Sequence, residues 1–276
     1  MQSAPISQPS AQSFLSSEEA KFFQEHGYLI VRQLLPDTER QMMVEVTESG
    51  LQNEIPPVEF EADVHYPGAP TSLDAVGGRT VRRLKQAYSR HPVFGEWMAS
   101  PAVAGRLQQL FDGRRILMPL AHHNCVMTKQ PRFSSDTLWH QDIRYWTYRR
   151  PELISIWLAL GTERPENGCL WVIPGSHRRE FGPHQFDEAL FFRTDLAENQ
   201  ALIQSRIPVE LDPGDVLFFH CLTLHAASKN ATRKPKFAAV FTFRPEDNPP
   251  EPGSRSAAAA ELLLPDIQIK GSEETI

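Results

Sequence analysis

The sequence predicts a mainly β protein with flanking helices, built on a jelly-roll core of the cupin type. Helical signals lie in residues 16–112, whereas residues 114–245 contain short apolar runs separated by turn signals such as Asp212-Pro213-Gly214. Helices followed by a series of strands indicate helices that buttress a β-core. Two-sheet jelly rolls are the β-architecture that most often holds a metal between its sheets. A chain of 276 residues is long enough for one such domain.

The first residues are expected to form a disordered tail and then a short helix. Residues 1–15 are rich in Ser, Gln and Pro, a composition typical of disorder. Ser16 or Ser17 can cap a helix that carries acidic residues in its first turn, and Gly27 provides its stop. A strand over residues 28–32 is expected to follow.

A second helix, a long loop and a broken helix complete the expected N-terminal part. Pro36 begins the second helix, which runs to about Gly50. Residues 52–80 contain many Pro and Gly and show little periodicity, and a loop this long more often forms a lid or pocket wall than a passive connector. The apolar spacing over residues 94–111 is helical and is broken at Pro101.

The remaining elements are predicted to be strands of a single domain that runs from residue 16 to residue 276. The expected strands are residues 116–127, 153–160, 169–173, 207–211, 216–219 and 237–243. This assignment gives a β-core at about 114–245, a helical buttress at 16–112 and a C-terminal extension at 246–276. The alanine run 257–260 suggests a short helix in that extension.

Charge and cysteine content argue against several classes of protein. The net charge of −6 and the pI of about 5.9 do not suit a nucleic-acid binder that relies on a basic surface. Cys125, Cys169 and Cys221 lack the spacing of a disulfide framework or a zinc site and suggest a reducing compartment. No secretory signal and no apolar run long enough for a membrane span are visible. We therefore expect a cytoplasmic monomer or homodimer without nucleic-acid or membrane partners.

Two histidines and one carboxylate form the candidate catalytic centre. In an extended segment the side chains at i and i+2 share one face, so His140 and Asp142 can grip one ion. The strand over residues 214–219 is expected to bring in His225 as the third ligand, with His220 pointing to the opposite face. Two His and one carboxylate are the facial set that holds ferrous iron and leaves positions open for catalysis.

Three stretches of the chain occur in an order and spacing that point to a known family. They are Trp139-His140-Gln141-Asp142, the run Glu-Asn-Gly-Cys-Leu-Trp-Val-Ile-Pro-Gly-Ser-His at 166–177, and the run Pro-Gly-Asp-Val-Leu-Phe-Phe-His at 213–220 that leads to His225. On these residues the chain, from about residue 20 to 245, resembles the phytanoyl-CoA dioxygenase family of iron(II)- and 2-oxoglutarate-dependent oxygenases. The resemblance implies a double-stranded β-helix fold that uses Fe(II), 2-oxoglutarate and O2.

The resemblance also implies roles for individual residues. The iron ligands it assigns are His140, Asp142 and His225, which would be the catalytic residues. Gln141 falls among the family's co-substrate contacts, and Trp157 matches a tryptophan that lines the co-substrate pocket. Weaker alignments place three further residues near 2-oxoglutarate, namely Cys125, Lys129 and Arg83.

The chain departs from the family where the distal carboxylate of 2-oxoglutarate is held. The family commonly has an arginine at the position of Lys236, and arginine offers a planar two-pronged grip where lysine offers a point charge. A buried lysine can still hold a carboxylate, and Arg233 in the preceding loop is an alternative clamp. Ala227 replaces a small polar residue and removes one possible hydrogen bond to the co-substrate.

The expected reaction is hydroxylation of a small molecule, with release of succinate and carbon dioxide. Halogenating relatives replace the iron-binding carboxylate with a small residue, so Asp142 favours hydroxylation, desaturation or ring formation over halogenation. The cations and aromatics of residues 144–150 suit an anionic substrate with an apolar body. Two alternatives remain open: a cupin-like metal enzyme that does not use 2-oxoglutarate, and a catalytically silent small-molecule-binding protein on the same fold.

Overall fold

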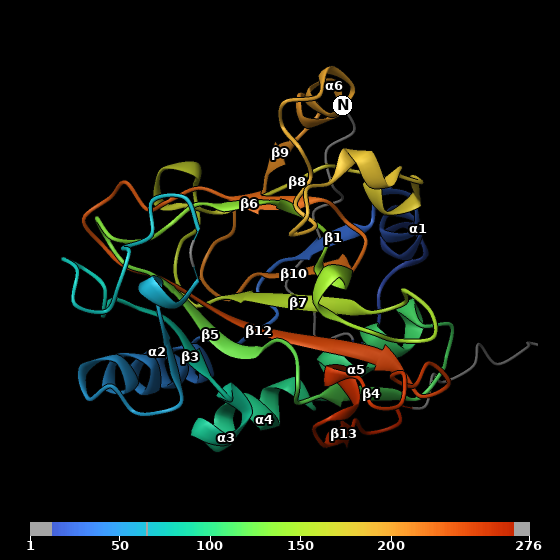
Figure 1. The fold of residues 1–276 in the computed structure, drawn as a ribbon. Helices are drawn as coiled ribbons and strands as arrows, with labels where there is room; N and C mark the ends of the chain where they lie inside the picture. The colour runs from blue at the N-terminus through green and yellow to red at the C-terminus, as the bar shows by residue number, and fades with distance from the viewer. Residues whose placement is uncertain (1–12, 65, 268–276) are drawn as a thin grey trace, which may run out of the picture.

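Two antiparallel sheets face each other and form the core of the protein. The computed structural model describes residues 13–64 and 66–267. In Figure 1 the smaller sheet, with β6 and β8, lies above the larger one, with β10, β7, β12 and β5. The pairing orders β1-β10-β7-β12-β5-β3-β2 and β6-β11-β8-β9 give the predicted jelly roll in its double-stranded β-helix form.

The strands of the larger sheet are β1 (Tyr28–Val31), β2 (Val58–Phe60), β3 (Val81–Lys85), β4 (Ile116–Pro119), β5 (Asn124–Lys129), β7 (Ile154–Ala159), β10 (Val216–His220), β12 (Lys236–Pro245) and β13 (Glu261–Leu263). The strands of the smaller sheet are β6 (Thr137–His140), β8 (Leu170–Val172), β9 (Ile207–Pro208) and β11 (His225–Ala227).

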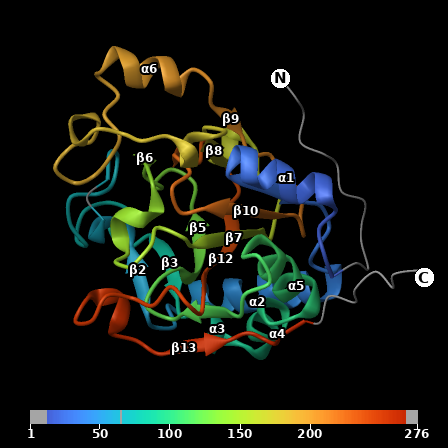
Figure 2. The same cartoon turned by 90° about the vertical axis from the view of Figure 1, so that its right-hand side faces the viewer.

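Helices cover the outer face of the larger sheet, as the order of helices and strands predicts. The α-helices are α1 (Ser17–His26), α2 (Asp37–Gln52), α3 (Ala87–Arg90), α4 (Pro92–Met98), α5 (Pro101–Leu110) and α6 (Ala197–Ile203). The 3₁₀ turns are η1 (Glu61–Asp63), η2 (Asp142–Tyr145), η3 (Pro165–Asn167), η4 (Ser176–Arg178), η5 (Pro183–Gln185) and η6 (Arg255–Ala257). Figure 2 shows α2, α3, α4 and α5 together below the sheets, while α6 stands apart at the opposite end.

The capping signals of the first helix are confirmed. The Ser16 side chain accepts a hydrogen bond from the Glu19 backbone N–H, and the Glu19 carboxylate accepts one from the Ser16 N–H. Gly27 ends the helix with φ of 76°, a conformation that favours glycine. The expected break at Pro101 also holds, since α4 ends at Met98 and α5 begins at Pro101.

The central strand β12 sorts its side chains between the two faces of the larger sheet. Val240 pairs with Cys125 of β5 and Trp157 of β7, and Lys236 pairs with Lys129. Because side chains alternate along a strand, residues 236, 238, 240 and 242 point to one face. That face is the barrel interior, because Thr242 contacts Ser155 beside the metal-ligand residues described below.

Several local expectations are wrong. The run 116–127 forms two strands, β4 and β5, and His122 and His123 lie in the turn between them. Residues 52–80 are not wholly irregular, because they contain β2 and η1. The alanine run forms no α-helix; η6 includes only its first residue.

Two further differences concern the ends of segments. The expected disordered tail lies outside the described residues up to residue 12, but Leu15 is buried and its N–H donates to the Gln109 side chain. The strand β10 does not carry His225, because a turn at residues 221–224 follows it and His225 begins β11 in the other sheet. None of the described helices has the length and apolar character needed to cross a bilayer.

Candidate metal centre and active site

The three expected metal ligands converge at one end of the smaller sheet. His140 is the last residue of β6 and pairs directly with His225, the first residue of β11. Gln141 is extended, with φ of −107° and ψ of 136°, and this places Asp142 beside His140 at the start of η2. The candidate ligand atoms of the three residues lie within 4.8 Å of one another, and all three residues are buried.

The hydrogen bonds of the two histidines leave one ring nitrogen of each available for a metal. The Nδ1 atoms of His140 and His225 lie 2.8 and 3.0 Å from the carbonyl oxygens of Leu138 and Thr223, so each Nδ1 carries the proton. The Nε2 atoms then present lone pairs, and they lie 3.6 and 3.5 Å from Asp142 Oδ1. Asp142 Oδ1 is buried and accepts no hydrogen bond, and it faces the lone pairs of both Nε2 atoms. A divalent cation bound between these three atoms would fit this arrangement.

The electrostatic surroundings keep this set in the form that a metal requires. Burial by itself would raise the pKa of the Asp142 carboxyl, but His123, His225 and His140 outweigh it and the pKa is lowered. Burial and the neighbouring His140 lower the pKa of His225 to about 4. At neutral pH Asp142 is therefore a carboxylate and His225 a neutral imidazole.

A hydroxyl pair from the larger sheet fixes the orientation of the carboxylate. Ser155 Oγ, on β7, donates to Asp142 Oδ2 at 3.2 Å and lies 3.1 Å from Thr242 Oγ1 on β12. Both serine and threonine are fully buried. The carboxylate thus has one oxygen hydrogen-bonded and the other directed at the two histidines.

We expect Ser155→Ala to lower metal affinity by about 10- to 100-fold, because partners that orient metal ligands have effects of this size. Anaerobic calorimetric titration with Fe(II) measures the change. Ser205→Ala, which removes an exposed hydroxyl bonded only to the Leu202 carbonyl, is the control and should bind metal as the unmodified chain does. Equal affinity in both variants would show that Ser155 does not position Asp142.

Aromatic rings shield the ligand set from water. The Phe219 ring lies 5.1 Å from the His225 ring, and the Tyr145 and Phe191 rings lie 5.9 and 6.0 Å from the His140 ring. The Arg144 guanidinium stacks over Phe191 at 3.6 Å. These contacts provide the dry shell that an oxidising metal centre needs.

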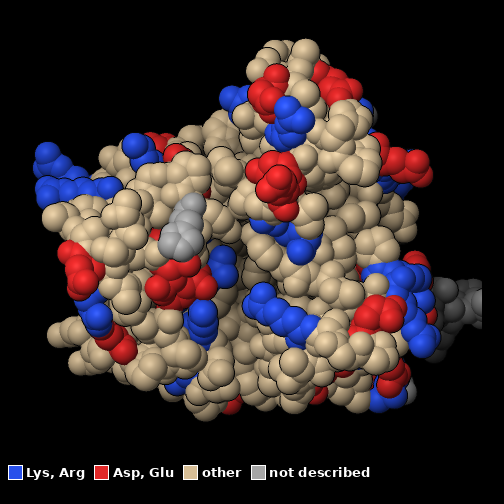
Figure 3. All heavy atoms as spheres, viewed as in Figure 1, with Lys and Arg blue, Asp and Glu red and all other residues tan. Residues whose placement is uncertain are grey.

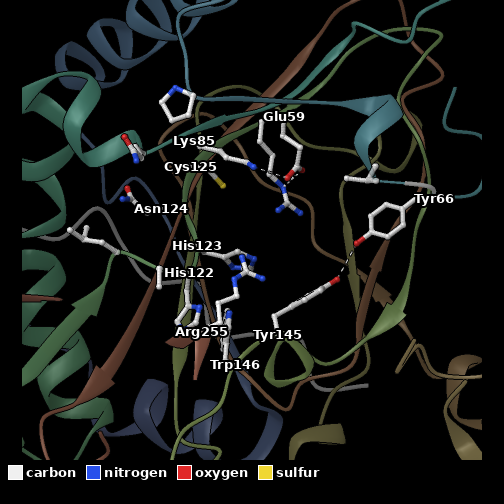
Figure 4. Close-up of a pocket in the computed structure, with 16 residues that line it drawn as sticks. Glu59, Tyr66, Lys85, His122, His123, Asn124, Cys125, Tyr145, Trp146 and Arg255 are labelled. Atoms are coloured by element: carbon white, nitrogen blue, oxygen red, sulfur yellow. Dashed lines mark hydrogen bonds and ion pairs between the residues drawn. The ribbon is translucent and has the colours of Figure 1, made fainter. Parts of the chain in front are cut away.

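A cavity of about 420 Å³ opens beside the ligand set. His123 and Tyr145 connect it to the metal ligands, since His123 Nδ1 lies 3.6 Å from Asp142 Oδ2. Figure 4 shows the hydrogen bond between the Tyr66 and Tyr145 hydroxyls along one side, with an O–O distance of 3.0 Å. Glu59 and Lys85 lie at the top of the cavity in this view, above His123 and His122.

The expected clamp for the distal carboxylate of 2-oxoglutarate is in the barrel interior, but it is already paired. Lys236 is 3% exposed, and its Nζ lies 2.9 Å from Glu163 Oε2. Trp157 Nε1 donates to the other oxygen of the same carboxylate at 2.7 Å. Two residues assigned to the co-substrate by resemblance are therefore engaged by one internal carboxylate.

The other residues assigned to the co-substrate have mixed placements. Cys125 lines the cavity, and Arg83 lines it too with its Nε 3.2 Å from Glu59 Oε1. The Gln141 amide donates to the Leu222 carbonyl at 2.6 Å, so it fixes the chain next to the ligands. Arg233 is exposed in the loop before β12 and lines no part of the cavity.

Sequence reasoning missed two residues that the site brings together. His123 falls within the strand expected over residues 116–127, a position from which one of His122 and His123 could face the pocket, but its approach to Asp142 depends on the turn between β4 and β5. Glu163 lies next to the Glu-Asn-Gly turn and was not considered. It stands in the polar connection 161–168 between Thr162 and Arg164, where nothing in the sequence distinguishes it from a solvated loop carboxylate.

The turn after Glu163 needs its glycine. Gly168 has φ of 78°, and a Cβ there would lie 2.3 Å from the Ser228 carbonyl oxygen. This turn connects β7 of the larger sheet to β8 of the smaller one, so it is a turn between two barrel strands and not a plain hairpin.

The two-sheet barrel and its two-histidine, one-carboxylate set define the class: a non-haem iron, 2-oxoglutarate-dependent dioxygenase. The phytanoyl-CoA dioxygenase (PhyH) family model matches residues 23–238, and the chain belongs to this family. Iron and 2-oxoglutarate are accordingly its cofactor and co-substrate, with His140, Asp142 and His225 as the metal-binding triad.

Curated relatives and solved structures agree with this placement. A probable phytanoyl-CoA dioxygenase of Caenorhabditis elegans is 26% identical over 80% of this chain and 72% of its own length. The peroxisomal phytanoyl-CoA dioxygenase of Homo sapiens is 26% identical over 79% of this chain, which spans 65% of the human protein.

Two solved structures show the same fold. The α-ketoglutarate-dependent carbocyclase SnoK from nogalamycin biosynthesis has a TM-score of 0.66 and 24% identity, with 87% of each chain covered. EctD from S. alaskensis, solved with 2-oxoglutarate and 5-hydroxyectoine, has a TM-score of 0.70 and 20% identity, with 90% of this chain and 84% of EctD covered.

Proposed function

We propose that this protein hydroxylates a small anionic molecule held in the cavity beside His140, Asp142 and His225. The observation that carries the proposal is the convergence of the three buried ligand atoms within 4.8 Å at the edge of a cavity of about 420 Å³. A cavity of this size suits a small metabolite. The proposal rests on the site itself, because membership of a family does not determine the substrate of one member.

The side chains have separate tasks in this reaction. When bound, iron(II), 2-oxoglutarate and dioxygen supply the oxidation that converts a C–H bond to an alcohol and the oxo acid to succinate and carbon dioxide. Ser155 and the two backbone carbonyls hold the metal ligands in orientation. Phe219 and Phe191 exclude water, which protects the reacting centre from side reactions.

Cations in the cavity wall support an anionic substrate. Three lining residues are positively charged, namely Arg83, Lys85 and Arg255, and one is acidic, Glu59. Burial lowers the pKa of His122 to about 3 and also lowers the pKa of His123, so neither adds positive charge at neutral pH. On the face shown in Figure 3, Lys and Arg side chains border a hollow near the middle of the molecule.

The charges expected to attract an anion come from a different segment. Of residues 144–150, only Tyr145 and Trp146 line the cavity. Arg144 stacks on Phe191 and donates to the Ala189 carbonyl, while Arg150 pairs with Glu152. The aromatic part of that expectation therefore fits the cavity, and the cations are supplied by β3 and the turn before β13.

A succinate assay tests the proposed reaction. The protein is supplied with Fe(II), ascorbate and 2-oxoglutarate under air, together with a panel of candidate substrates. Iron-dependent succinate that disappears in Asp142→Ala supports the proposal. Retention of metal without any binding of 2-oxoglutarate by calorimetry would contradict it and favour a cupin-like enzyme that uses no oxo acid.

We expect carboxylic acids in the panel to release more succinate than their primary amides, because the cavity wall carries excess positive charge. Arg255→Gln should reduce the acid-to-amide ratio by several-fold, since this guanidinium pairs with no carboxylate among the described residues. Arg149→Gln, an exposed arginine away from the cavity, is the control. A ratio near one in the unmodified chain would rule out recognition of the anion.

A further inference from the structure

The internal carboxylate of Glu163 makes the same contacts that an incoming dicarboxylate would need. Its oxygens are held by the Lys236 ammonium at 2.9 Å and the Trp157 indole N–H at 2.7 Å. No other hydrogen bond of Lys236 is found among the described residues, and the ammonium also lies 4.9 Å from the Trp157 ring centroid. Glu163 therefore already neutralises the Lys236 ammonium and occupies the single N–H of the Trp157 indole, while two of the three ammonium N–H groups have no acceptor among the described residues.

The backbone fixes Glu163 in this position. Its N–H donates to the Leu211 carbonyl at 2.8 Å, and its own carbonyl accepts from the Leu211 N–H at 3.2 Å. The residue is fully buried. The cavity beside the metal centre is lined by Cys125 but by neither Glu163 nor Lys236, so the pair lies outside its wall.

A second cation lies beside this pair. Lys129 is directly opposite Lys236 in the β5–β12 register, and facing side chains of antiparallel strands lie close together. Its ammonium donates to the carbonyls of Ser135 and Ser228 and forms no ion pair with a described carboxylate. Burial and Lys236 lower the pKa of Lys129 to about 7. This region of the barrel therefore contains two lysines, Lys129 and Lys236, and one carboxylate, that of Glu163.

We propose that Glu163 is an internal competitor for 2-oxoglutarate, whose distal carboxylate has to compete with Glu163 for the positive charge of Lys236. This inference rests on the proposed function and concerns the selectivity of the same reaction. When the distal carboxylate takes over Lys236, the Glu163 carboxylate loses its cation and stays buried, which is unfavourable. Lys129, which pairs with Lys236 in the register of β5 and β12, is a second buried cation in this region. The exchange weakens binding of 2-oxoglutarate specifically, because an oxo acid without a distal carboxylate leaves the Glu163–Lys236 pair intact.

Binding to the iron-loaded protein, measured by anaerobic calorimetry, tests the proposal without relying on turnover. Glu163→Gln keeps an oxygen for Lys236 and removes the competing charge. We expect it to tighten 2-oxoglutarate binding by at least about tenfold and to change 2-oxobutyrate binding by less than about twofold. Glu210→Gln, which removes an exposed carboxylate at the same end of the barrel, should change neither.

A second variant guards against misfolding. Glu163→Asp keeps the charge but ends one methylene short of Lys236, so it should also tighten 2-oxoglutarate binding, by less than Glu163→Gln. If the unmodified chain binds 2-oxoglutarate and neither variant binds it more tightly, the competitor role is wrong while the proposed function stands. If the two variants bind 2-oxoglutarate and the unmodified chain does not, the result would support the proposal, because Glu163 would then block binding completely. Metal retention with no 2-oxoglutarate binding in any chain would overturn the proposed function and this inference with it.

Discussion

Asp142→Ala is expected to abolish oxygenase activity and to weaken iron binding by more than about 100-fold. Loss of an orienting partner alone costs about 10- to 100-fold, and this change removes a ligand itself. The two remaining Nε2 atoms have no anion between them, so a divalent cation would keep two neutral ligands only. Metal content after dialysis and anaerobic titration with Fe(II) measure the loss.

The control separates loss of the ligand from loss of the fold. Asp195→Ala removes an exposed carboxylate that pairs with Arg193 and should bind iron normally. Asp142→Ala should keep the circular dichroism spectrum of the metal-free unmodified chain but be less stable to denaturant, because the lowered pKa of Asp142 means that the fold stabilises its carboxylate at neutral pH. Full iron affinity in Asp142→Ala would show that the metal is held elsewhere. His140, Asp142 and His225 would then not be the iron site on which the assignment of the protein class depends.

The sequence determined the metal ligands better than the strands that carry them. His140 and Asp142 could be paired from a local pattern, because an extended Gln141 is enough to bring them together. The strand of His225 was misassigned because the apolar run of β10 leads directly towards it. The turn between β10 and β11 depends on Thr223 Oγ1 donating to the Gly27 carbonyl, 196 residues away, and no local pattern reports such a contact.

The co-substrate end of the site shows the same limit. The alternation of β12 correctly places Lys236 inside the barrel, since strand periodicity is a local property. Its partner Glu163 is 73 residues away and meets it only because β7 and β12 are neighbours in the larger sheet. Buried ion pairs between distant segments follow from the topology, so the interior position of Lys236 could be predicted from sequence and its carboxylate partner could not.

Lys236→Met is expected to destabilise the protein by about 3–5 kcal/mol, because it leaves the buried Glu163 carboxylate without a cation. Glu163→Met should also be destabilising, since it leaves the buried Lys236 ammonium without a carboxylate partner. The double variant Glu163→Met/Lys236→Met should recover most of the loss, because an apolar pair of similar volume can replace a buried ion pair at little cost. Urea unfolding of the four metal-free chains gives the coupling energy.

Oxo acid binding then separates stability from recognition. The double variant has a stable barrel and no clamp, so it should bind 2-oxoglutarate no more tightly than 2-oxobutyrate. Lys236→Arg restores the residue common in the family and should keep the preference for 2-oxoglutarate, although Glu163 still competes for the larger cation. Additive destabilisation by the two single changes would mean that the residues are uncoupled. A preference for 2-oxoglutarate that survives in the double variant would move the clamp away from Lys236, with Lys129 as the next cation in the register.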